Sequence, residues 1–546
     1  MSRKILQIHP LDNAIVALTD LEKEEVFELN GKTIQLLESI PAKHKFCIQD
    51  LAPGDLVIMY GVTVGKAQSF ISKGALLNTI NIKHDSADFE LTPGKYTWTP
   101  PDISVFAEKT FLGYHREDGQ VGTANYWVVI PLVFCENRNV ETIKEAFLEE
   151  LGYAKPNPYK NLVRQLVQQT QTKEAAAEQV LERIKTTPAN RVFENIDGIK
   201  FLTHQGGCGG TREDAEMLCQ LLAGYIHHPN VAGATVLSLG CQHAQANILQ
   251  EKLRELNPDF KKPLLIFEQQ QSGTEEQLLY RAITDTFQHL NQANAISRKP
   301  ASLSKLRIGL ECGGSDGFSG ISANPVLGHV SDLLTALGGS AVLAEFPELC
   351  GVEQELINRC VDEQKAAKFT QLMRAYSASA EAVGSGFDMN PSPGNIRDGL
   401  ITDAIKSCGA AKKGGTSPVT DVLDYGEYIQ NPGLNLLCTP GNDVESTTAL
   451  AGSGCNIILF TTGLGTPTGN PVSPVVKVST NNRLAERMPD IIDFNTGPVI
   501  SGEKTIEEMG EELFKKIIRI ASGIESTKAM DLGQDDFIPW KRGVSL

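Results

Sequence analysis

The sequence of 546 residues lacks the features that mark membrane, secreted and nucleic-acid-binding proteins. No run of about 18 apolar residues occurs, so no membrane-spanning helix is expected. The first residues, MSRKILQIHPLDNAIVAL, lack an apolar segment ending in a small-residue cleavage site, which argues against a signal peptide. A formal charge of −16 disfavours a nucleic-acid partner, because phosphates require basic surface patches. These absences predict a cytoplasmic globular protein.

Standard nucleotide-binding and zinc-binding motifs are also missing. No G-x-x-x-x-G-K-[ST] occurs, and the segment GLGTPTG breaks the G-x-G-x-x-G spacing of a dinucleotide-binding turn. The 11 cysteines contain no C-x-x-C pair, so a zinc ribbon or knuckle is not expected. In a reducing compartment these cysteines remain thiols.

The first 92 residues differ in pattern from the rest of the chain. Short apolar segments such as AIVAL, EVFEL and DLVIMYG are separated by turn residues, among them NGK and APGD. Short pieces rich in β-branched residues favour strands over helices. We therefore expect a small β-rich domain in residues 1–92, followed by a proline-containing linker in residues 93–110.

After the linker, strands of the buried type alternate with helices. NYWVVIPLVF, GIKFLTH and GATVLSLG each precede a loop and then a helical pattern, and Thr274 with Gln277 fits a capping box. The polar stretch NQANAISRKPASLSK marks a second boundary near residue 300. The expected fold is an α/β body with largely parallel sheets, divided into two Rossmann-like subdomains, residues 111–300 and 301–546.

Several cysteines lie at or just past the predicted end of a strand. They are Cys135, Cys208, Cys241, Cys312 and Cys438. In parallel α/β folds the ligand crevice lies at the carboxyl ends of the strands, which favours thiolate or metal-ligand roles for two or three of these residues. The alternative is that each cysteine is a small apolar residue in a buried turn.

The segment LECGGSDGFSG places Glu311, Cys312 and Asp316 on a flexible loop after a buried strand. The further candidate groups are His204, Glu345, Glu348, Asp443, Arg397, Lys406, Lys412, Lys413, Asn395 and Asn442. Thiolate and imidazole ligands suit iron or zinc, whereas carboxylates suit harder cations. The alternatives are a hydrogen-bonded core histidine at His204 and an exposed helix face at Lys412 and Lys413. The residues alone predict an α/β enzyme with a metal.

Long motifs of the chain resemble the altronate and galactarate dehydratase family. They are LECGGSDGFSGISANPVLG, NPSPGN, PGLNLLCTPGND, ALAGSGC, TTGLGTPTG, THQGGCGG, LSLGC and DGQVGTANYW. IHPLDNAIVAL, IPAKHKFCIQDLAPGD and MYGVTVGKA resemble the small β-clip domain of that family, also called a SAF domain. The resemblance covers nearly the whole chain and implies a SAF-like domain followed by the α/β body.

The resemblance implies a metal-dependent hydro-lyase that converts D-altronate to 2-dehydro-3-deoxy-D-gluconate and water. The alternatives are dehydration of another acid, such as galactarate or sulfolactate, and a sugar-acid-binding homologue without catalysis. A cation bound to the substrate carboxylate would stabilise the enediolate that forms when the C2 proton is removed. A general base would take that proton, and a general acid would protonate the leaving C3 hydroxyl.

From the resemblance and the strand-end pattern we assign expected roles to individual residues. The predicted catalytic residues are His44, Lys45, Glu311 and Asp316. The predicted substrate-binding residues are Asn125, Arg138, Asn395 and Asn442. The predicted metal ligands are His204, Cys208, Cys241 and Cys312. The expected cofactor is a divalent metal, Fe²⁺ or Mn²⁺, with an iron–sulfur cluster as the alternative that the cysteines permit. The expected partners are a sugar acid and a second copy of the chain.

Two short segments depart from the pattern of the family that the chain resembles. Many relatives have VHTHN where this chain has LNTIN at residues 77–81, so any metal role of that segment is in doubt. Many have GVRN where this chain has GTAN at residues 122–125, which removes an arginine that could hold a substrate carboxylate. Either the substrate differs, or the nearby Arg138 supplies the same charge.

Overall fold

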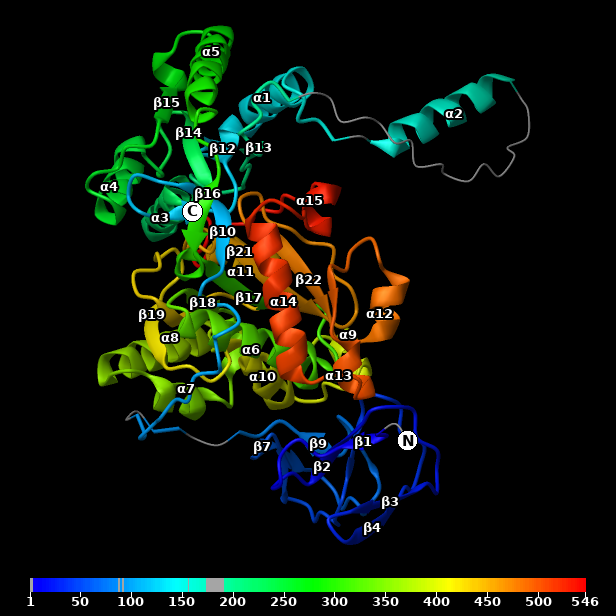
Figure 1. Ribbon diagram of the computed structural model, residues 1–546. Helices are drawn as coiled ribbons and strands as arrows, with labels where there is room; N and C mark the ends of the chain where they lie inside the picture. Colours follow the sequence, from blue (N-terminus) through cyan, green and yellow to red (C-terminus); the bar gives the residue numbers. More distant parts are fainter. Residues whose placement is uncertain (1–2, 87–88, 91–92, 156, 173–190) are drawn as a thin grey trace.

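The computed structural model describes residues 3–86, 89–90, 93–155, 157–172 and 191–546. Three bodies lie one above another in Figure 1, with the N-terminal β domain at the bottom, the largest sheet in the middle and a smaller α/β domain at the top. Within these described ranges, no helix has the length and apolar character needed to cross a membrane.

The N-terminal domain is built from short antiparallel strands. They are β1 (Ile5–Leu6), β2 (Ala14–Ala17), β3 (Val26–Leu29), β4 (Lys32–Gln35), β5 (Lys45–Cys47), β6 (Leu56–Met59), β7 (Val62–Ala67), β8 (Leu76–Leu77) and β9 (Ile82–Lys83). They form a sheet of order β1-β2-β5-β8, a sheet of order β6-β7-β9 and the hairpin β3-β4. Asn30 and Gly31 both have positive φ, as a two-residue turn of type I′ between β3 and β4 requires.

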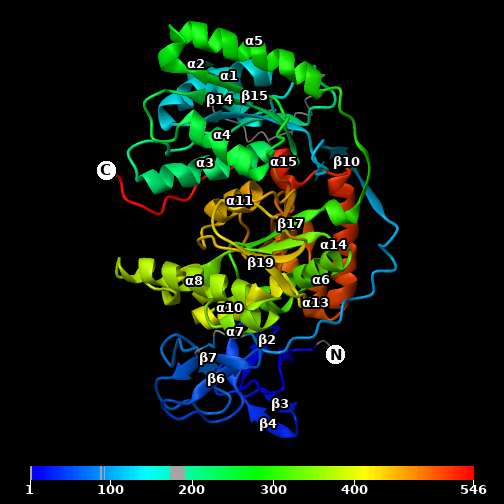
Figure 2. The ribbon, with the colours of Figure 1, turned by 90° about the vertical axis from the view of Figure 1, so that its left-hand side faces the viewer.

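The connections into and out of the upper α/β domain pair with each other. No helix or strand occurs in residues 93–109, which run along the side of the molecule in Figure 2. They lead to β10 (Thr110–His115), which pairs antiparallel with β11 (Val121–Gly122) and with β16 (Lys299–Ser302). Because β10 enters this domain and β16 leaves it, the domain is joined to the rest by two neighbouring strands.

The upper domain has a parallel sheet with helices on both faces. Its strands are β12 (Tyr126–Pro131), β13 (Gly198–Phe201), β14 (Val231–Ser238) and β15 (Leu264–Glu268), in the order β13-β12-β14-β15. Its helices are α1 (Asn137–Glu150), α2 (Pro158–Thr172), α3 (Arg212–His227), α4 (Ala246–Leu256) and α5 (Glu275–Ala293). Helices α1 and α5 pack on one face and α3 and α4 on the other. The capping box predicted at Thr274 and Gln277 is confirmed at the start of α5.

The C-terminal domain is centred on a parallel seven-stranded sheet of order β19-β20-β18-β17-β21-β22-β23. The strands are β17 (Arg307–Cys312), β18 (Ser340–Leu343), β19 (Val419–Leu423), β20 (Gly433–Leu437), β21 (Ile457–Thr462), β22 (Val475–Ser479) and β23 (Phe494–Asn495). Its α-helices are α6 (Ala323–Ala336), α7 (Glu353–Arg359), α8 (Glu363–Glu381), α9 (Pro393–Arg397), α10 (Asp403–Ala411), α11 (Asp443–Gly452), α12 (Asn482–Arg487), α13 (Gly497–Ser501), α14 (Ile506–Ala521) and α15 (Lys528–Leu532).

Both faces of this sheet are covered, which explains why its strands are near-continuous apolar runs. Helices α6 and α14 pack on one face, and α11 covers the other together with α3 of the upper domain. Helices α3 and α11 touch through Gly224 and Gly452: a Cβ on Gly224 would lie 1.9 Å from the carbonyl oxygen of Gly452. The expected α/β body with parallel sheets behind a small β domain is confirmed.

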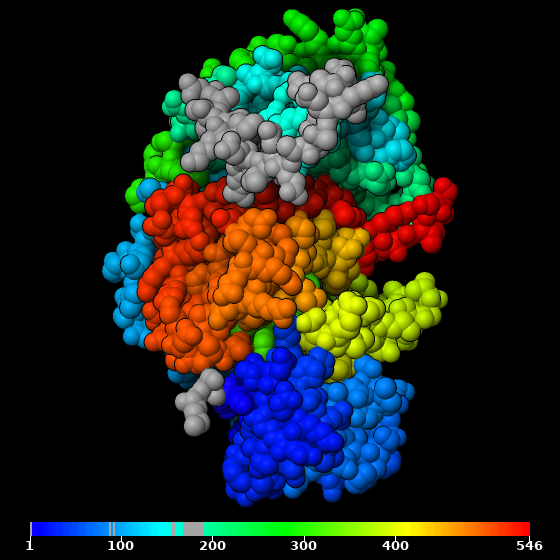
Figure 3. Space-filling view, turned by 90° about the vertical axis from the view of Figure 1, so that its right-hand side faces the viewer, coloured from blue at the N-terminus to red at the C-terminus, as the bar shows by residue number. Residues whose placement is uncertain are grey.

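The N-terminal domain is docked onto the C-terminal domain, as the separate lower lobe of Figure 3. Lys45 Nζ donates to the carbonyl oxygen of Gly399 at 2.6 Å, and Thr402 Oγ1 donates to that of Val64 at 2.8 Å. A Cβ on Gly399 would lie 2.4 Å from the carbonyl oxygen of Lys43. Glycine is therefore required at residue 399 for the two domains to approach this closely.

Candidate active site

The carboxyl edge of the seven-stranded sheet collects acidic and basic side chains. Glu311 and Cys312 end β17, the central strand, while Glu345 follows β18 and Asp443 opens α11 after β20. Parallel strands bring their carboxyl ends to one edge, so these residues from distant parts of the sequence meet there. A Cβ on Gly313 would lie 2.0 Å from Asp443 Oδ2, which accounts for a glycine directly after Cys312.

Three carboxyl groups of this cluster can share one cation. Glu311, Glu345 and Asp443 each offer an oxygen within 4.8 Å of the others. Oε1 of Glu311 and Oε1 of Glu345 are buried without a hydrogen-bond partner, although Ser446 Oγ donates to Glu311 Oε2 at 2.6 Å. Burial and the neighbouring Glu345 raise the pKa of Glu311 well above its usual range. Burial, with the charges of Glu345 and Glu348, raises the pKa of Asp443 to about 7.

The thiol side of the cluster is held by two lysines. Cys312 Sγ donates to Glu348 Oε2 at 3.1 Å, and Lys413 Nζ donates to Cys312 Sγ at 2.9 Å and to Glu345 Oε2 at 2.8 Å. Lys406 Nζ lies 2.5 Å from Glu348 Oε1. Burial, followed by the charges of Glu345 and Glu348, raises the pKa of Cys312, so the thiol stays protonated. Burial opposes ionisation of Glu348, but Lys406 and Lys413 outweigh it and hold its pKa below the usual range.

A third lysine lies beside the carboxylates on β22. Lys477 is fully buried, its Nζ donates to Thr468 Oγ1 at 2.9 Å, and this Nζ lies 3.5 Å from the centre of the Phe460 ring. Burial lowers the pKa of Lys477 to about 7, although Asp443 acts in the opposite direction. Four carboxyl groups thus face three lysines, one of which is half-charged near neutral pH. Ionisation of all four carboxyl groups would give the cluster an excess of negative charge, which a bound cation would balance.

The predicted catalytic residue Asp316 contacts the N-terminal domain. Its buried carboxylate accepts hydrogen bonds from Ser319 Oγ and Thr480 Oγ1 and lies 3.0 Å from Lys43 Nζ. Lys43 also pairs with Asp398 at 2.7 Å and has a positive φ of 76°, a conformation that costs a non-glycine residue strain. Lys43 was not among the residues predicted from sequence.

The two predicted residues next to Lys43 face different surroundings. Lys45 is fully buried, and its ammonium group donates a hydrogen bond to the Gly399 carbonyl oxygen. His44 is half-buried, and its Nδ1 lies 3.2 Å from the carbonyl oxygen of Ala42. Lys45 therefore docks the N-terminal domain, and the catalytic role predicted for His44 stays a prediction.

His204 has both of its ring nitrogens occupied. Nε2–H donates to the Pro131 carbonyl oxygen at 2.7 Å, and Nδ1 accepts the Gly206 N–H at 3.1 Å. Burial lowers the pKa of His204 to about 4, so the ring stays neutral. A metal would have to displace one of these hydrogen bonds. The structure therefore places His204 as a hydrogen-bonded core histidine, the alternative that the sequence left open.

The predicted thiol ligands fall into two separate sheets. Cys208 and Cys241 are exposed on loops after β13 and β14 of the upper domain, whereas Cys312 is buried at the end of β17. Among the described residues, no group of three metal-binding side chains contains His204, Cys208 or Cys241. The structure thus does not bring the four predicted metal ligands together. Cys312 alone belongs to the acidic cluster, where Glu345 and Glu348 complete its group.

The pocket beside His204 and Cys208 is lined by both aromatic and polar side chains. It has a volume of about 660 Å³ and is lined by Phe537 and Trp540 of the C-terminal segment as well as by the glycine-rich loop around Cys208. Leu546 N donates to the Gly209 carbonyl oxygen at 2.8 Å, so the end of the chain lies across this loop.

Two predicted substrate-binding residues have local structural roles in the upper domain. Asn125 is buried, and its side chain donates to the Asn195 carbonyl oxygen at 2.7 Å and accepts from Arg116 at 3.0 Å. Arg138 is exposed and pairs with Glu275. The structure therefore shows no free polar group of Asn125 for a substrate, and it places Arg138 in a surface ion pair.

The other two predicted substrate-binding residues flank the cluster. Asn395 completes the capping box of α9, and its Nδ2 donates to the carbonyl oxygen of Ser315 at 2.8 Å, beside Asp316. Asn442 is the exposed N-cap of α11, where its Oδ1 accepts the N–H of Val444 at 3.1 Å. Asn395 therefore shapes the loop that carries Asp316, and Asn442 shapes the helix start that carries the cluster residue Asp443.

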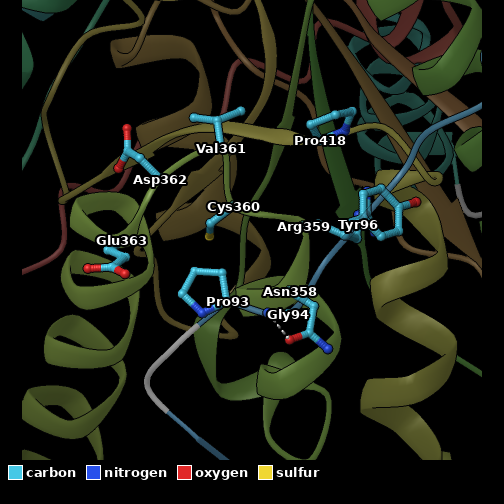
Figure 4. A pocket seen from close by; sticks show the side chains of 10 residues that line it. All are labelled: Pro93, Gly94, Tyr96, Asn358, Arg359, Cys360, Val361, Asp362, Glu363 and Pro418. Carbon is cyan, nitrogen blue, oxygen red and sulfur yellow. Dashed lines mark hydrogen bonds between the residues drawn. The ribbon is translucent and has the colours of Figure 1, made fainter.

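A hollow elsewhere on the surface contains no comparable chemistry. In Figure 4 it lies between the linker at Pro93 and Gly94 and the end of α7, with a volume of about 480 Å³. Asn358 Oδ1 accepts the Gly94 N–H at 2.9 Å, and the Arg359 guanidinium donates to the Ser417 carbonyl oxygen at 2.7 Å. Asn358 thus holds the linker in place, and Arg359 binds the segment before β19.

Comparison with known proteins gives matches over the whole chain. Residues 3–85 match a family model described as altronate/galactarate dehydratase SAF domain. Residues 113–294 match D-galactarate dehydratase/altronate hydrolase, second domain, and residues 303–545 match D-galactarate/altronate dehydratase, C-terminal. The chain is similar to an altronate dehydratase of Bacillus subtilis strain 168, with 36% identity over 95% of both chains.

Two relatives from Escherichia coli strain K12 also align over almost the full length. An altronate dehydratase is 34% identical over 99% of both chains. A galactarate dehydratase (L-threo-forming) is 28% identical over 96% of this chain and 93% of the relative. The motifs that carry the sequence resemblance are thus part of a similarity that includes all three domains.

Proposed function

The chain belongs to the altronate/galactarate dehydratase family and is a hydro-lyase that dehydrates a sugar acid, and from this premise we propose that its substrate is D-altronate. The product would be 2-dehydro-3-deoxy-D-gluconate, with water as the second product. The two relatives named altronate dehydratase are 36% and 34% identical to the chain, against 28% for the galactarate dehydratase. Galactarate is the second candidate.

The observation that carries the proposal is the buried acidic cluster at the carboxyl edge of the seven-stranded sheet. Removing the C2 proton of an aldonate creates a dianionic enediolate, which needs positive charge fixed in place before the reaction. Lys406 and Lys413 are held protonated by Glu348 and Glu345, so they supply two such charges. We expect them to face the substrate carboxylate.

Glu311, Glu345 and Asp443 fit a divalent cation. The unpartnered oxygens of Glu311 and Glu345 are acceptors that a cation would satisfy, and an all-carboxylate donor set suits a hard ion such as Mn²⁺. When bound, such an ion supplies Lewis-acid stabilisation of the negative charge on the substrate carboxylate. The side chains that would hold the ion come from β17, the turn after β18 and the start of α11.

Lys477 is the residue we propose as general base. Its pKa of about 7 leaves a neutral amine near neutral pH, and it lies close enough to Asp443 and Glu311 for their charges to act on it. A group whose pKa lies near the working pH is the most effective proton acceptor. The role of Asp316 as acid or base stays a prediction, because its carboxylate is engaged by Lys43.

An iron–sulfur cluster would use a different set of residues. Cys135, Cys208 and Cys241 are exposed and follow the neighbouring strands β12, β13 and β14. Their loops are joined by backbone hydrogen bonds from Phe134 N to the Gly206 carbonyl oxygen and from Ala244 N to that of Gly207, at 3.1 and 3.0 Å. Three thiols on linked loops support a cluster at this place as the second cofactor candidate.

A substrate panel tests the proposed function. The protein is incubated with D-altronate, galactarate and sulfolactate, with Fe²⁺ or Mn²⁺ added, and 2-keto acid formation is measured. D-Altronate should give the highest kcat/KM, and Glu311→Gln should lower it by orders of magnitude. Preference for galactarate would overturn the substrate assignment, and sugar-acid binding without product would favour a non-catalytic homologue.

The absorption spectrum of anaerobically purified protein separates the two cofactors, because an iron–sulfur cluster absorbs visible light and Fe²⁺ bound by carboxylates does not absorb strongly. A visible spectrum that disappears in Cys208→Ser would place the cofactor on the three thiols. A colourless protein that loses its metal in Glu311→Gln would place the cofactor in the acidic cluster.

A further inference from the structure

A second group of metal-binding side chains lies where the N-terminal domain meets the C-terminal domain. His84 follows β9, Cys350 follows the short 3₁₀ helix Phe346–Leu349, and Asp403 is the first residue of α10. A ring nitrogen, the sulfur and a carboxylate oxygen of these residues lie within 4.8 Å of one another. None of the three belongs to the acidic cluster described above.

Asp403 is the unusual member of this group. Its side chain is fully buried, and apart from the adjacent Cys350 thiol neither carboxylate oxygen has a hydrogen-bond partner. The α10 N-terminus is already capped by Thr402, whose Oγ1 accepts the N–H of Ile405, so Asp403 is not needed as the cap. A buried carboxylate without a partner is costly, which indicates that a cation belongs beside it.

The other two members face Asp403. The Cys350 thiol lies against the carboxylate, and burial together with the negative charge of Asp403 raises the pKa of that thiol. His84 is half-buried, with its Nδ1 3.4 Å from the Ala404 N–H, a long contact that a metal could replace at low cost. The nearby Glu353 is already engaged, because its carboxylate accepts the N–H of Gly351 at 2.7 Å.

We propose that His84, Cys350 and Asp403 bind one divalent transition-metal ion of the Zn²⁺ class. Nitrogen, sulfur and oxygen together form a donor set for a borderline-soft ion, and three protein ligands leave one position for water. Binding releases the proton of the Cys350 thiol and gives the Asp403 carboxylate its missing partner. Because His84 comes from the N-terminal domain and the others from the C-terminal domain, the ion joins the two domains.

Cobalt titration of the full chain tests the site, since Co²⁺ replaces Zn²⁺ and a thiolate ligand gives it a strong near-ultraviolet charge-transfer band. The band should appear in the wild type and in Cys312→Ser, and be lost in Cys350→Ser. His84→Gln should weaken Co²⁺ binding by at least 10–100-fold. Loss of a residue that only hydrogen-bonds to a metal ligand already lowers metal affinity by that factor.

Asp403→Asn keeps the test independent of folding. Without metal it should be at least as resistant to heat as the wild type, because a neutral amide replaces an unpartnered carboxylate, but Zn²⁺ should no longer raise its Tm. The proposal is overturned if the cobalt band survives in Cys350→Ser, if it disappears only in Cys312→Ser, if no band forms, or if Zn²⁺ raises the Tm of Asp403→Asn as it does that of the wild type. Activity is not the readout, so failure of the proposed dehydratase function leaves this test unaffected.

Discussion

Buried neutral His204 should make the stability of the protein depend on pH in the weakly acidic range. The folded protein holds this ring with a pKa of about 4, because burial disfavours the charge, whereas an unfolded chain has a histidine pKa of about 6.5. Between these two values the unfolded state binds more protons than the folded state. The free energy of unfolding therefore rises with pH across this window, and stability is lost as the pH falls through it.

The size of the effect follows from the two pKa values. Between about pH 7.5 and pH 5, the contribution of His204 falls by about 2 kcal/mol, since one unit of pKa difference corresponds to 1.36 kcal/mol. In His204→Gln this contribution is removed, and the fall in stability on acidification should be smaller by that amount. Urea unfolding at several pH values measures it, with the exposed His243→Gln as the matched control.

The same variant separates a core histidine from a metal ligand. If His204 is a core residue, His204→Gln should keep its metal content and most of its kcat near pH 7.5. An unchanged pH dependence of unfolding, combined with loss of bound metal, would refute the structural assignment and restore the ligand role predicted from sequence. The hydrogen bonds to both ring nitrogens argue for the first result.

Lys413→Met should lower the free energy of unfolding by about 3–5 kcal/mol and abolish activity, because it leaves Glu345 buried without its cation. Lys412→Met, at the neighbouring half-buried lysine, should do neither. Urea unfolding measures the stability of both variants, and kcat measures their activity. If Lys477 is the general base, kcat/KM of the wild type should rise as the pH rises through about 7, since only the neutral amine accepts a proton. Lys477→Met should lower kcat by roughly 10²–10⁴-fold. A kcat/KM that does not change with pH would contradict this role of Lys477. Lys43→Met should increase proteolysis of residues 93–109, because the ion pairs of Lys43 with Asp316 and Asp398 are lost. The control Lys23→Met, at an exposed lysine, should be cleaved as slowly as the wild type. Chelation should remove activity and added Fe²⁺ or Mn²⁺ should restore it; full activity after verified metal removal would exclude a catalytic metal.

The sequence predicted the fold better than it predicted the site. Alternating short strands, strand–helix repeats and the capping box of α5 are local patterns, and each was found as expected. The strand-end cysteines were also placed correctly along the chain. The predicted boundary near residue 300 put Cys208 and Cys312 in different subdomains, but local pattern could not show whether the two sheet edges meet, because that depends on how the sheets pack.

Some residues of the site could not be assigned from sequence, because their contacts depend on how distant segments pack. Glu345, Glu348 and Lys413 were among the candidates, but only packing shows that they contact Cys312. Lys477 lies in PVVKVS, where a single charge inside a buried strand was the signal that could have identified it. Lys43 gave no such signal, since its partners come from another domain.

The contact between Gly224 and Gly452 bears on how the enzyme can open to admit a substrate. With α3 and α11 touching backbone to backbone, the two parallel sheets are joined along a seam that has no room for a side chain. Sliding or rotation at that seam would force main-chain atoms into each other, so these two domains should move as one rigid unit. An opening motion then requires the N-terminal domain to separate from the C-terminal domain, which breaks the polar contacts of Lys43 and Lys45 and the apolar packing that the two domains share.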